Sequence, residues 1–230
     1  MREQQELEQA IGYSFSNAGL LAQALTHSSY AHERHLTGAD NERLEYLGDA
    51  VLELVTSEFL YNKYPQYPEG ELTRIRAALV CEVSLNETAV ALELGDFIRM
   101  AHGEEKTGGR TRKSILSDAV EAMIGAMYLD GGFEPAKAFI HRFVLVNTEK
   151  KALFHDAKSL LQEETQGRGM GRAVYEIIDQ SGPDHAKTFK VAVYVQGEKM
   201  GEGVGHTKKD AEKEASFVAL MKLKGDGENR

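Results

Sequence analysis

The sequence predicts two domains of different fold class, an all-α domain followed by a small α+β domain. Two observations support this prediction. Apolar residues recur at spacings of three and four through the first 150 residues, which is typical of amphipathic helices. Further along, apolar residues occupy every second position over 189–195, as in a half-buried strand. We therefore expect a front domain over 1–150, a linker over 151–156 and a rear domain over 157–225.

The helical periodicity of the front domain is clearest in four stretches: 20–25, 44–54, 72–80 and 115–129. Segment 103–113 is polar and contains three glycines, so we expect a mobile loop there.

The rear domain begins with a helix over 157–166. Three strands follow, over 174–180, over 189–195 and through the glycine-rich stretch 201–205. The last helix opens at Thr207, and Asp210 three residues later makes the start close to a capping box. The order α-β-β-β-α is that of a complete small α+β domain.

Composition limits the possible classes of protein. No apolar stretch approaches the ~20 residues that a membrane-spanning helix needs, so we expect no membrane association. The polar, acidic start does not resemble a secretory signal. A single cysteine, Cys81, excludes an internal disulfide framework and a cysteine-rich zinc site, and we expect it in the core. Together these features predict a cytoplasmic protein.

The negative charge is concentrated in the front domain. Residues 155–230 hold 12 Lys+Arg against 13 Asp+Glu, whereas residues 1–154 hold 15 against 23. The front domain would repel a polyanion unless divalent cations intervened. Composition alone leaves open whether this acidity indicates metals or a solvated surface.

Carboxylates recur at helical spacing in two apolar segments. Glu42, Glu45 and Asp49 lie at i, i+3 and i+7, and would share one helix face. Asp118 and Glu121 lie at i and i+3 in a second, more apolar segment. Acids in such a helix are costly to bury unless a cation compensates them. Two facing helices of this kind could hold Mg²⁺, which prefers oxygen ligands, and a metal pair can hydrolyse a phosphodiester. From spacing alone, a solvated acidic face stays open.

These segments resemble the ribonuclease III family. The stretch NERLEYLGDAVL at 41–52 matches the signature motif of that family almost residue for residue. The flanking motifs follow in the family's order: ALTHSS at 24–29, EGELT at 69–73 with Arg76-Ala77, and SILSDAVEA at 114–122. The resemblance extends over essentially the whole chain.

The resemblance implies a homodimeric endonuclease that cuts both strands of double-stranded RNA. Products would carry 5′-phosphates and short 3′ overhangs, and rRNA and mRNA processing would be the role. Glu45, Asp118 and Glu121 would ligate Mg²⁺, with Mn²⁺ able to substitute, and Asp49 would ligate the metal or orient its water; Asp49 and Glu121 would be the catalytic pair. Glu42 and Glu69 match auxiliary acidic positions. No small-molecule cofactor is implied.

Three other residues have simpler interpretations. Tyr46 matches an aromatic residue that the family places at the dimer contact, and core packing is the alternative. We expect Gly48 to permit close approach of two helices. His27 is expected to cap or pack rather than to ligate, because imidazole is not needed beside oxygen-bound Mg²⁺.

The rear domain resembles the double-stranded RNA-binding domain. Its last helix would present free N–H groups and a partial positive charge to phosphates, together with Lys208, Lys209 and Lys213. Gln162 and Glu163, expected to be exposed on the first helix, and His185 in a loop would meet the minor grooves and recognise RNA shape. Three lysines on a helix are by themselves more typical of a solvated face than of an RNA contact.

Two functions other than duplex cleavage make different predictions about the sequence. A non-catalytic RNA-binding protein of this fold predicts a broken set of acids, whereas the set is intact. A phosphohydrolase of small nucleotides usually relies on histidine–aspartate pairs in helices, and none accompanies the carboxylates at 42–49 and 118–121.

Overall fold

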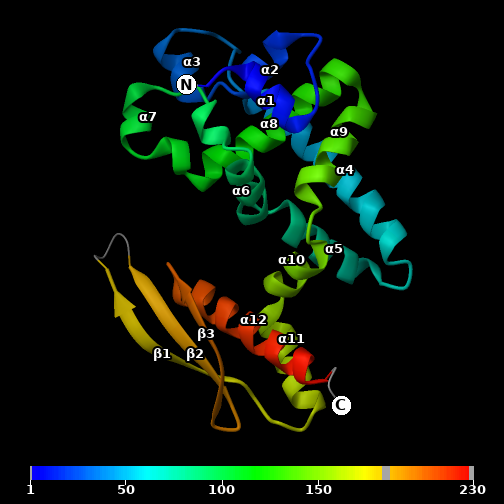
Figure 1. Cartoon of the computed structure of the whole chain (residues 1–230), viewed down its shortest axis with the longest axis vertical. Helices are drawn as coiled ribbons and strands as arrows, with labels where there is room; N and C mark the ends of the chain where they lie inside the picture. Colours follow the sequence, from blue (N-terminus) through cyan, green and yellow to red (C-terminus); the bar gives the residue numbers. More distant parts are fainter. Residues whose placement is uncertain (1, 183–186, 228–230) are drawn as a thin grey trace. The chain divides into compact units, whose positions relative to one another are not determined.

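The computed structural model describes residues 2–182 and 187–227, and it divides into two units, Met1–Thr148 and Glu149–Arg230 (Figure 1). Each unit has its own core. No helix among the described residues is long and apolar enough to cross a membrane.

The front unit is built from helices, which confirms the all-α prediction. Its α-helices are α1 (Gln4–Ile11), α2 (Ala18–Ala24), α3 (Ser28–Glu33), α4 (Glu42–Lys63), α5 (Glu69–Val80), α6 (Glu82–Ala91), α7 (His102–Lys106), α8 (Lys113–Gly131) and α9 (Phe133–Phe139). Short 3-10 turns cover Leu94–Asp96 and Gly109–Thr111, and a π-helical turn covers Ile140–Val144.

Helix α8 lies at the centre of this unit (Figure 1). Between Ile115 and Met127 every residue is buried except Asp118 and Glu121, which are half-buried. A helix that is apolar on all sides is stable only when other helices surround it. Helices α2, α4, α6 and α9 pack around α8 and provide that environment. The two acids are therefore the polar interruption of a core helix.

The mobile loop expected over 103–113 is not what the structure shows. This segment contains the end of α7, a 3-10 turn and the start of α8. Arg110 donates to the backbone carbonyls of Gly95 (2.6 Å) and Ile98 (3.2 Å), and Arg112 pairs with Glu104. The arginines make the segment compact because each guanidinium offers several donors to groups from separate turns.

The segment expected as a linker is also helical. Residues 151–156 fall largely within α10 (Thr148–His155), and the boundary between the two units lies at Thr148. The ring of Phe154 packs edge-on against Phe217, with ring centroids 5.4 Å apart, and this contact within the rear unit helps to hold the helix.

The rear unit confirms the order α-β-β-β-α. Helix α11 (Ala157–Gly167) precedes strands β1 (Val174–Ser181), β2 (Thr188–Val195) and β3 (Glu198–Gly205), and α12 (Lys208–Gly227) ends the described chain. The three strands form an antiparallel sheet in the order β1-β2-β3, with irregularities at Ile177/Asp179 and Val193/Tyr194. Val191, Val193 and Val195 are buried, as their alternation predicts.

The glycines of β3 allow α12 to lie directly on the sheet. A Cβ atom on Gly203 would approach the carbonyl oxygen of Ala211 and the amide nitrogen of Ala215 to 2.3 Å, and one on Gly201 would approach the Ala215 oxygen to 2.5 Å. The α12 residues whose backbone lies closest to these two glycines, Ala211 and Ala215, are alanines and fully buried. Small side chains on both surfaces thus fix the position of the helix that carries the expected RNA-binding lysines.

Candidate active site

Two glycines determine how closely α4 and α8 cross. A Cβ atom on Gly48 would lie 1.8 Å from the carbonyl oxygen of Glu121, and one on Gly125 would lie 2.2 Å from that of Leu44. Real Cβ atoms do not approach so closely, so both positions require glycine. The expectation that Gly48 permits close helix approach is confirmed. Gly125, its counterpart on α8, was not predicted, although its spacing of four from Glu121 places it near the same helix face.

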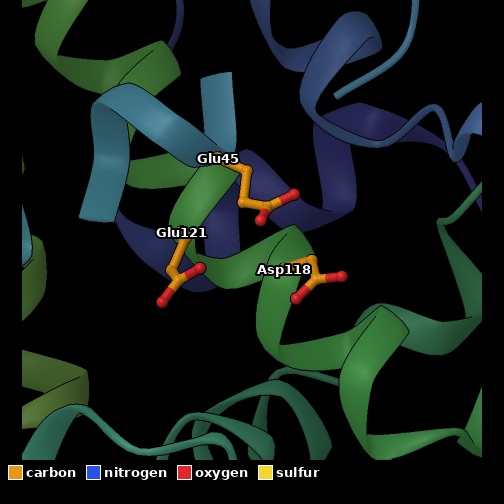
Figure 2. Close-up of side chains that lie close together, drawn as sticks. All are labelled: Glu45, Asp118 and Glu121. Atoms are coloured by element: carbon orange, nitrogen blue, oxygen red, sulfur yellow. The ribbon is translucent and has the colours of Figure 1, made fainter. Parts of the chain in front are cut away.

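The crossing brings three carboxylates together. Glu45 comes from α4, and Asp118 and Glu121 come from successive turns of α8 (Figure 2). One oxygen of each lies within 4.8 Å of one oxygen of each of the others. All three side chains are half-buried. The i, i+3 spacing of the α8 pair and the shared crossing explain why residues far apart in sequence form one cluster.

Repulsion and burial raise the proton affinity of the cluster. Burial raises the pKa of Glu121 to about 8, and the nearby charges of Asp49, Glu45 and Asp118 contribute in the same direction. Burial also raises the pKa of Glu45, assisted by Asp118, Glu42 and Asp49. The pKa of Asp118 is raised mainly by burial and further by Glu82, whereas Ser117 and His27 oppose the shift. The ionised cluster is therefore unfavourable without a counter-charge.

No basic side chain within the described residues forms an ion pair with Glu45, Asp118 or Glu121. Buried charges normally require a partner or a metal. Three carboxylates within ligating reach of one another are suitable oxygen donors for a hard divalent cation. The residues present thus fit a divalent metal site.

The other predicted acids lie outside this trio. Asp49 is exposed on α4, and its charge raises the pKa of both Glu121 and Glu45, so it lies beside the cluster. Glu42 is also exposed, and its charge likewise raises the pKa of Glu45. Glu69 is exposed at the start of α5 and accepts a hydrogen bond from the Thr73 hydroxyl at 2.9 Å.

Sequence reasoning missed Glu82 at the start of α6. Its charge raises the pKa of Asp118, so a further acid contributes to the field of the cluster. Glu82 follows Cys81 in a stretch without paired acids, and no spacing signal connects it to α8. Only the packing of α6 against α8 brings the two together.

His27 and Cys81 have structural surroundings. His27 is the N-cap of α3, and its Nδ1 accepts the Ser29 backbone N–H at 3.3 Å, which confirms the capping interpretation. Cys81 was expected in the core and is only half-buried, because it lies at the junction of α5 and α6. Its thiol donates to the Ala78 carbonyl at 3.4 Å.

Tyr46 is 82% exposed, so core packing within the front unit does not explain it. It borders a surface pocket together with Glu42, Arg43, Leu47 and Leu129 on the front unit; Gln23 and Leu44 complete the lining. Leu129 is 55% exposed. An exposed aromatic and an exposed leucine beside a surface hollow are a feature of protein–protein contacts.

In the rear unit the N-terminus of α12 matches the expectation. Thr207 accepts the backbone N–H of Asp210 at 3.1 Å, and its hydroxyl donates to the Asp210 carboxylate. Lys208 and Lys209 are exposed in the first turn, and Lys213 is half-buried one turn later. The capped helix end therefore carries Lys208 and Lys209 toward solvent.

The other predicted RNA-binding residues differ among themselves. Glu163 is exposed on α11, as expected. Gln162 was expected to be exposed and is half-buried, because it lies next to the buried Leu161 where α11 packs on α12. Its side-chain nitrogen is covered and has no hydrogen-bond partner within the described part of the chain. His185 lies outside the described residues.

Comparison with known proteins assigns both units. Residues 17–148 match the family model described as ribonuclease-III-like, and residues 157–223 match that of the double-stranded RNA binding motif. The chain belongs to the ribonuclease III family. Ribonuclease 3 of Moorella thermoacetica is 50% identical over 206 residues, covering 89% of this chain and 88% of that protein. Ribonuclease 3 of Geobacillus sp. WCH70 is 48% identical over 225 residues, covering 96% and 92%.

The fold agrees with that assignment. The nuclease domain of ribonuclease III from Campylobacter jejuni aligns with a TM-score of 0.59 at 48% identity, covering 64% of this chain and 97% of that one. As a member of the ribonuclease III family, which depends on divalent metal, the chain is an endoribonuclease that acts on double-stranded RNA.

Proposed function

We propose that the chain hydrolyses both strands of an RNA duplex at the acidic cluster where α4 crosses α8. The observation that supports this most directly is the trio Glu45, Asp118 and Glu121, whose oxygens lie within 4.8 Å of one another and whose pKa values are all raised. These three residues would hold Mg²⁺, with Mn²⁺ as a substitute.

A divalent cation bound there would supply a Lewis acid for the scissile phosphate and lower the pKa of an attacking water. The chain's own groups complete the site. Glu121, the most strongly perturbed of the acids, becomes a carboxylate at neutral pH only when positive charge offsets its burial. Asp49, exposed beside the cluster, accepts a hydrogen bond from the attacking water and orients it. Glu42 and Glu69 would be auxiliary acids nearer the contact between the two copies.

We further propose that two copies act together through the Tyr46 surface. The exposed ring, the pocket beside it and the exposed Leu129 would be covered in such a dimer. For the Campylobacter jejuni nuclease domain, a region involved in dimer formation has been described. Two sites on opposite strands would leave 5′-phosphates and short 3′ overhangs. Processing of rRNA and mRNA in the cytoplasm is the corresponding role.

The rear unit would hold the duplex through Lys208, Lys209 and Lys213 at the start of α12. Glu163, Gln162 and His185 would approach the minor grooves. The exposed Lys208 and Lys209 and the capped helix end support this arrangement, which suits shape recognition over roughly 16 base pairs.

The test is cleavage of a long labelled RNA duplex in Mg²⁺ by the wild type, Glu121→Gln and Glu134→Gln. Glu134 is an exposed acid on α9 outside the cluster and serves as the matched control. The loss of a ligand should remove several kcal/mol of transition-state stabilisation, so Glu121→Gln should cut about 100-fold more slowly or worse. Both variants should still shift the duplex on a native gel in Ca²⁺.

Binding without cleavage by the wild type would contradict the proposal and would favour a non-catalytic RNA-binding protein. Cleavage by Glu121→Gln at the wild-type rate would show that the cluster is not the active site.

A further inference from the structure

Two of the three lysines expected to contact RNA on α12 lie over aromatic rings. The Lys208 ammonium is 6.0 Å from the centroid of the Phe189 ring, and that of Lys213 is 5.1 Å from the centroid of Phe154. Phe189 belongs to β2, inside the RNA-binding fold. Phe154 belongs to α10, which precedes the residues 157–223 that match the RNA-binding motif.

The contact made by Phe154 is on the face of α12 that carries Lys209 and Lys213. Lys209, Lys213 and Phe217 are spaced by four residues and therefore share one helix face. The Phe154 ring packs edge-on against Phe217, at an interplanar angle of 70°, and lies beneath the ammonium of Lys213. The Phe154 ring of α10 thus lies beside the face of α12 that begins with the lysines of the first turn.

A ring in this position restricts a flexible side chain. Lysine loses substantial rotamer freedom when it is fixed, and that loss weakens a phosphate contact. The π face attracts the ammonium without consuming any of its three N–H donors as a carboxylate would. The acids on the same helix are engaged elsewhere: Glu212 pairs with Lys158, and Asp210 with Thr207. Lys213 is therefore held in place and keeps its charge for a ligand.

We propose that Phe154 is a positioning residue for double-stranded RNA binding, which orders Lys213 for a phosphate contact from outside the RNA-binding motif. This inference rests on the proposed role of Lys213. It makes α10 a functional part of the rear unit rather than a passive connection.

The test is a double-mutant cycle in the full chain, with Glu121→Gln as a background that should not cleave. The affinity for an RNA duplex is measured in Ca²⁺ by fluorescence anisotropy at several salt concentrations. Phe154→Leu should weaken binding about 2- to 5-fold, the size of a cation–π contact at an exposed site. Combined with Lys213→Gln, Phe154→Leu should cause no further loss. Phe154→Tyr, which keeps a π face, should bind within about 2-fold of the parent.

Lys209→Gln is the matched control, because Lys209 has no aromatic ring beneath it in the described part of the chain. In that background Phe154→Leu should again weaken binding about 2- to 5-fold. Thermal unfolding of each variant identifies any loss of fold.

The inference would be overturned if Phe154→Leu weakened duplex binding equally with Lys213 present and in the Lys213→Gln background. The ring would then act only on the fold. Unchanged or tighter binding by Phe154→Leu would overturn it as well. If Lys213→Gln alone changes neither the affinity nor the salt slope, the proposed phosphate contact fails and the inference with it. Lys213→Gln could instead reduce the slope of log affinity against log salt concentration by about 1, with an effect on affinity that is the same whether or not Phe154 is replaced. That result would keep the phosphate contact and overturn only the role of the ring.

Discussion

Replacement of Gly48 by alanine would place a methyl group 1.8 Å from the carbonyl oxygen of Glu121. The shortest contact that real Cβ atoms make is about 3.0 Å. The two helices would therefore have to separate by about 1 Å, since the obstructing atom is backbone and cannot rotate away. Overpacking of this kind costs about 1–3 kcal/mol and sometimes more.

The displacement would also affect the active site. Glu45 lies one turn before Gly48 on α4, and Glu121 is the residue that the new methyl group would displace. A shift of about 1 Å in a positioned group can lower the rate about 100-fold. We expect Gly48→Ala to lower both the free energy of unfolding and kcat.

Urea unfolding and duplex cleavage in Mg²⁺ measure the two effects. Gly70→Ala is the matched control, because a Cβ at this position in α5 meets nothing within 4 Å. It should leave cleavage unchanged and alter stability by at most about 1 kcal/mol, in the stabilising direction. Gly48→Ala with the stability and rate of the wild type would refute the reasoning that the glycine crossing builds the site.

Three further predictions follow from other parts of the chain. Because the pKa of Glu121 is raised to about 8, the metal-free folded state keeps a proton there at pH values where the unfolded state has lost it. The contribution of Glu121 to the free energy of unfolding is therefore present below pH ~4.5 and is lost as pH rises to about 8. Metal-free Glu121→Gln should therefore lose less stability than the wild type between pH 5 and 8, as urea unfolding in chelator would show; parallel curves would contradict this. Tyr46→Ala should weaken self-association about 30-fold or more, as for an interfacial hot spot, and shift monomer stability by less than about 0.5 kcal/mol; an unchanged sedimentation profile would exclude Tyr46 from the dimer contact. Gly203→Ala, whose Cβ would meet the backbone of α12 at 2.3 Å, should weaken duplex binding and destabilise the rear unit by about 1–3 kcal/mol; wild-type affinity and stability would contradict the close packing of α12 on β3.

Most of the fold follows from local patterns. Apolar spacing located α4, α5 and α8, and alternation located β2, because both patterns reflect which residues of each element are buried. The segment 103–113 was misjudged for the same reason: its order comes from Arg110 and Arg112, which bond to distant backbone carbonyls and adjacent acids rather than to an apolar face. Polar composition does not reveal such contacts.

The site was predictable to a similar degree. Helical spacing placed Asp118 and Glu121 on one face of α8 and Glu45 with two further acids on one face of α4, and the family resemblance assigned Glu45 to the same metal site as the α8 pair. Spacing could not show that Asp49 stays exposed or that Glu82 approaches Asp118, since both depend on how α4, α6 and α8 pack. The covered amide of Gln162 is another tertiary effect, arising where α11 meets α12.

Direct measurement of metal binding tests the central claim, that Glu45, Asp118 and Glu121 together form the cation site. Mn²⁺ binding would be followed by electron paramagnetic resonance for the wild type, Glu45→Gln, Asp118→Asn, Glu121→Gln and the Glu134→Gln control. We predict that each of the three cluster variants binds Mn²⁺ at least about tenfold more weakly than the wild type, a free-energy difference of about 1.4 kcal/mol, and that the control is unaffected. Equal Mn²⁺ affinity in the wild type and all three cluster variants would contradict the account.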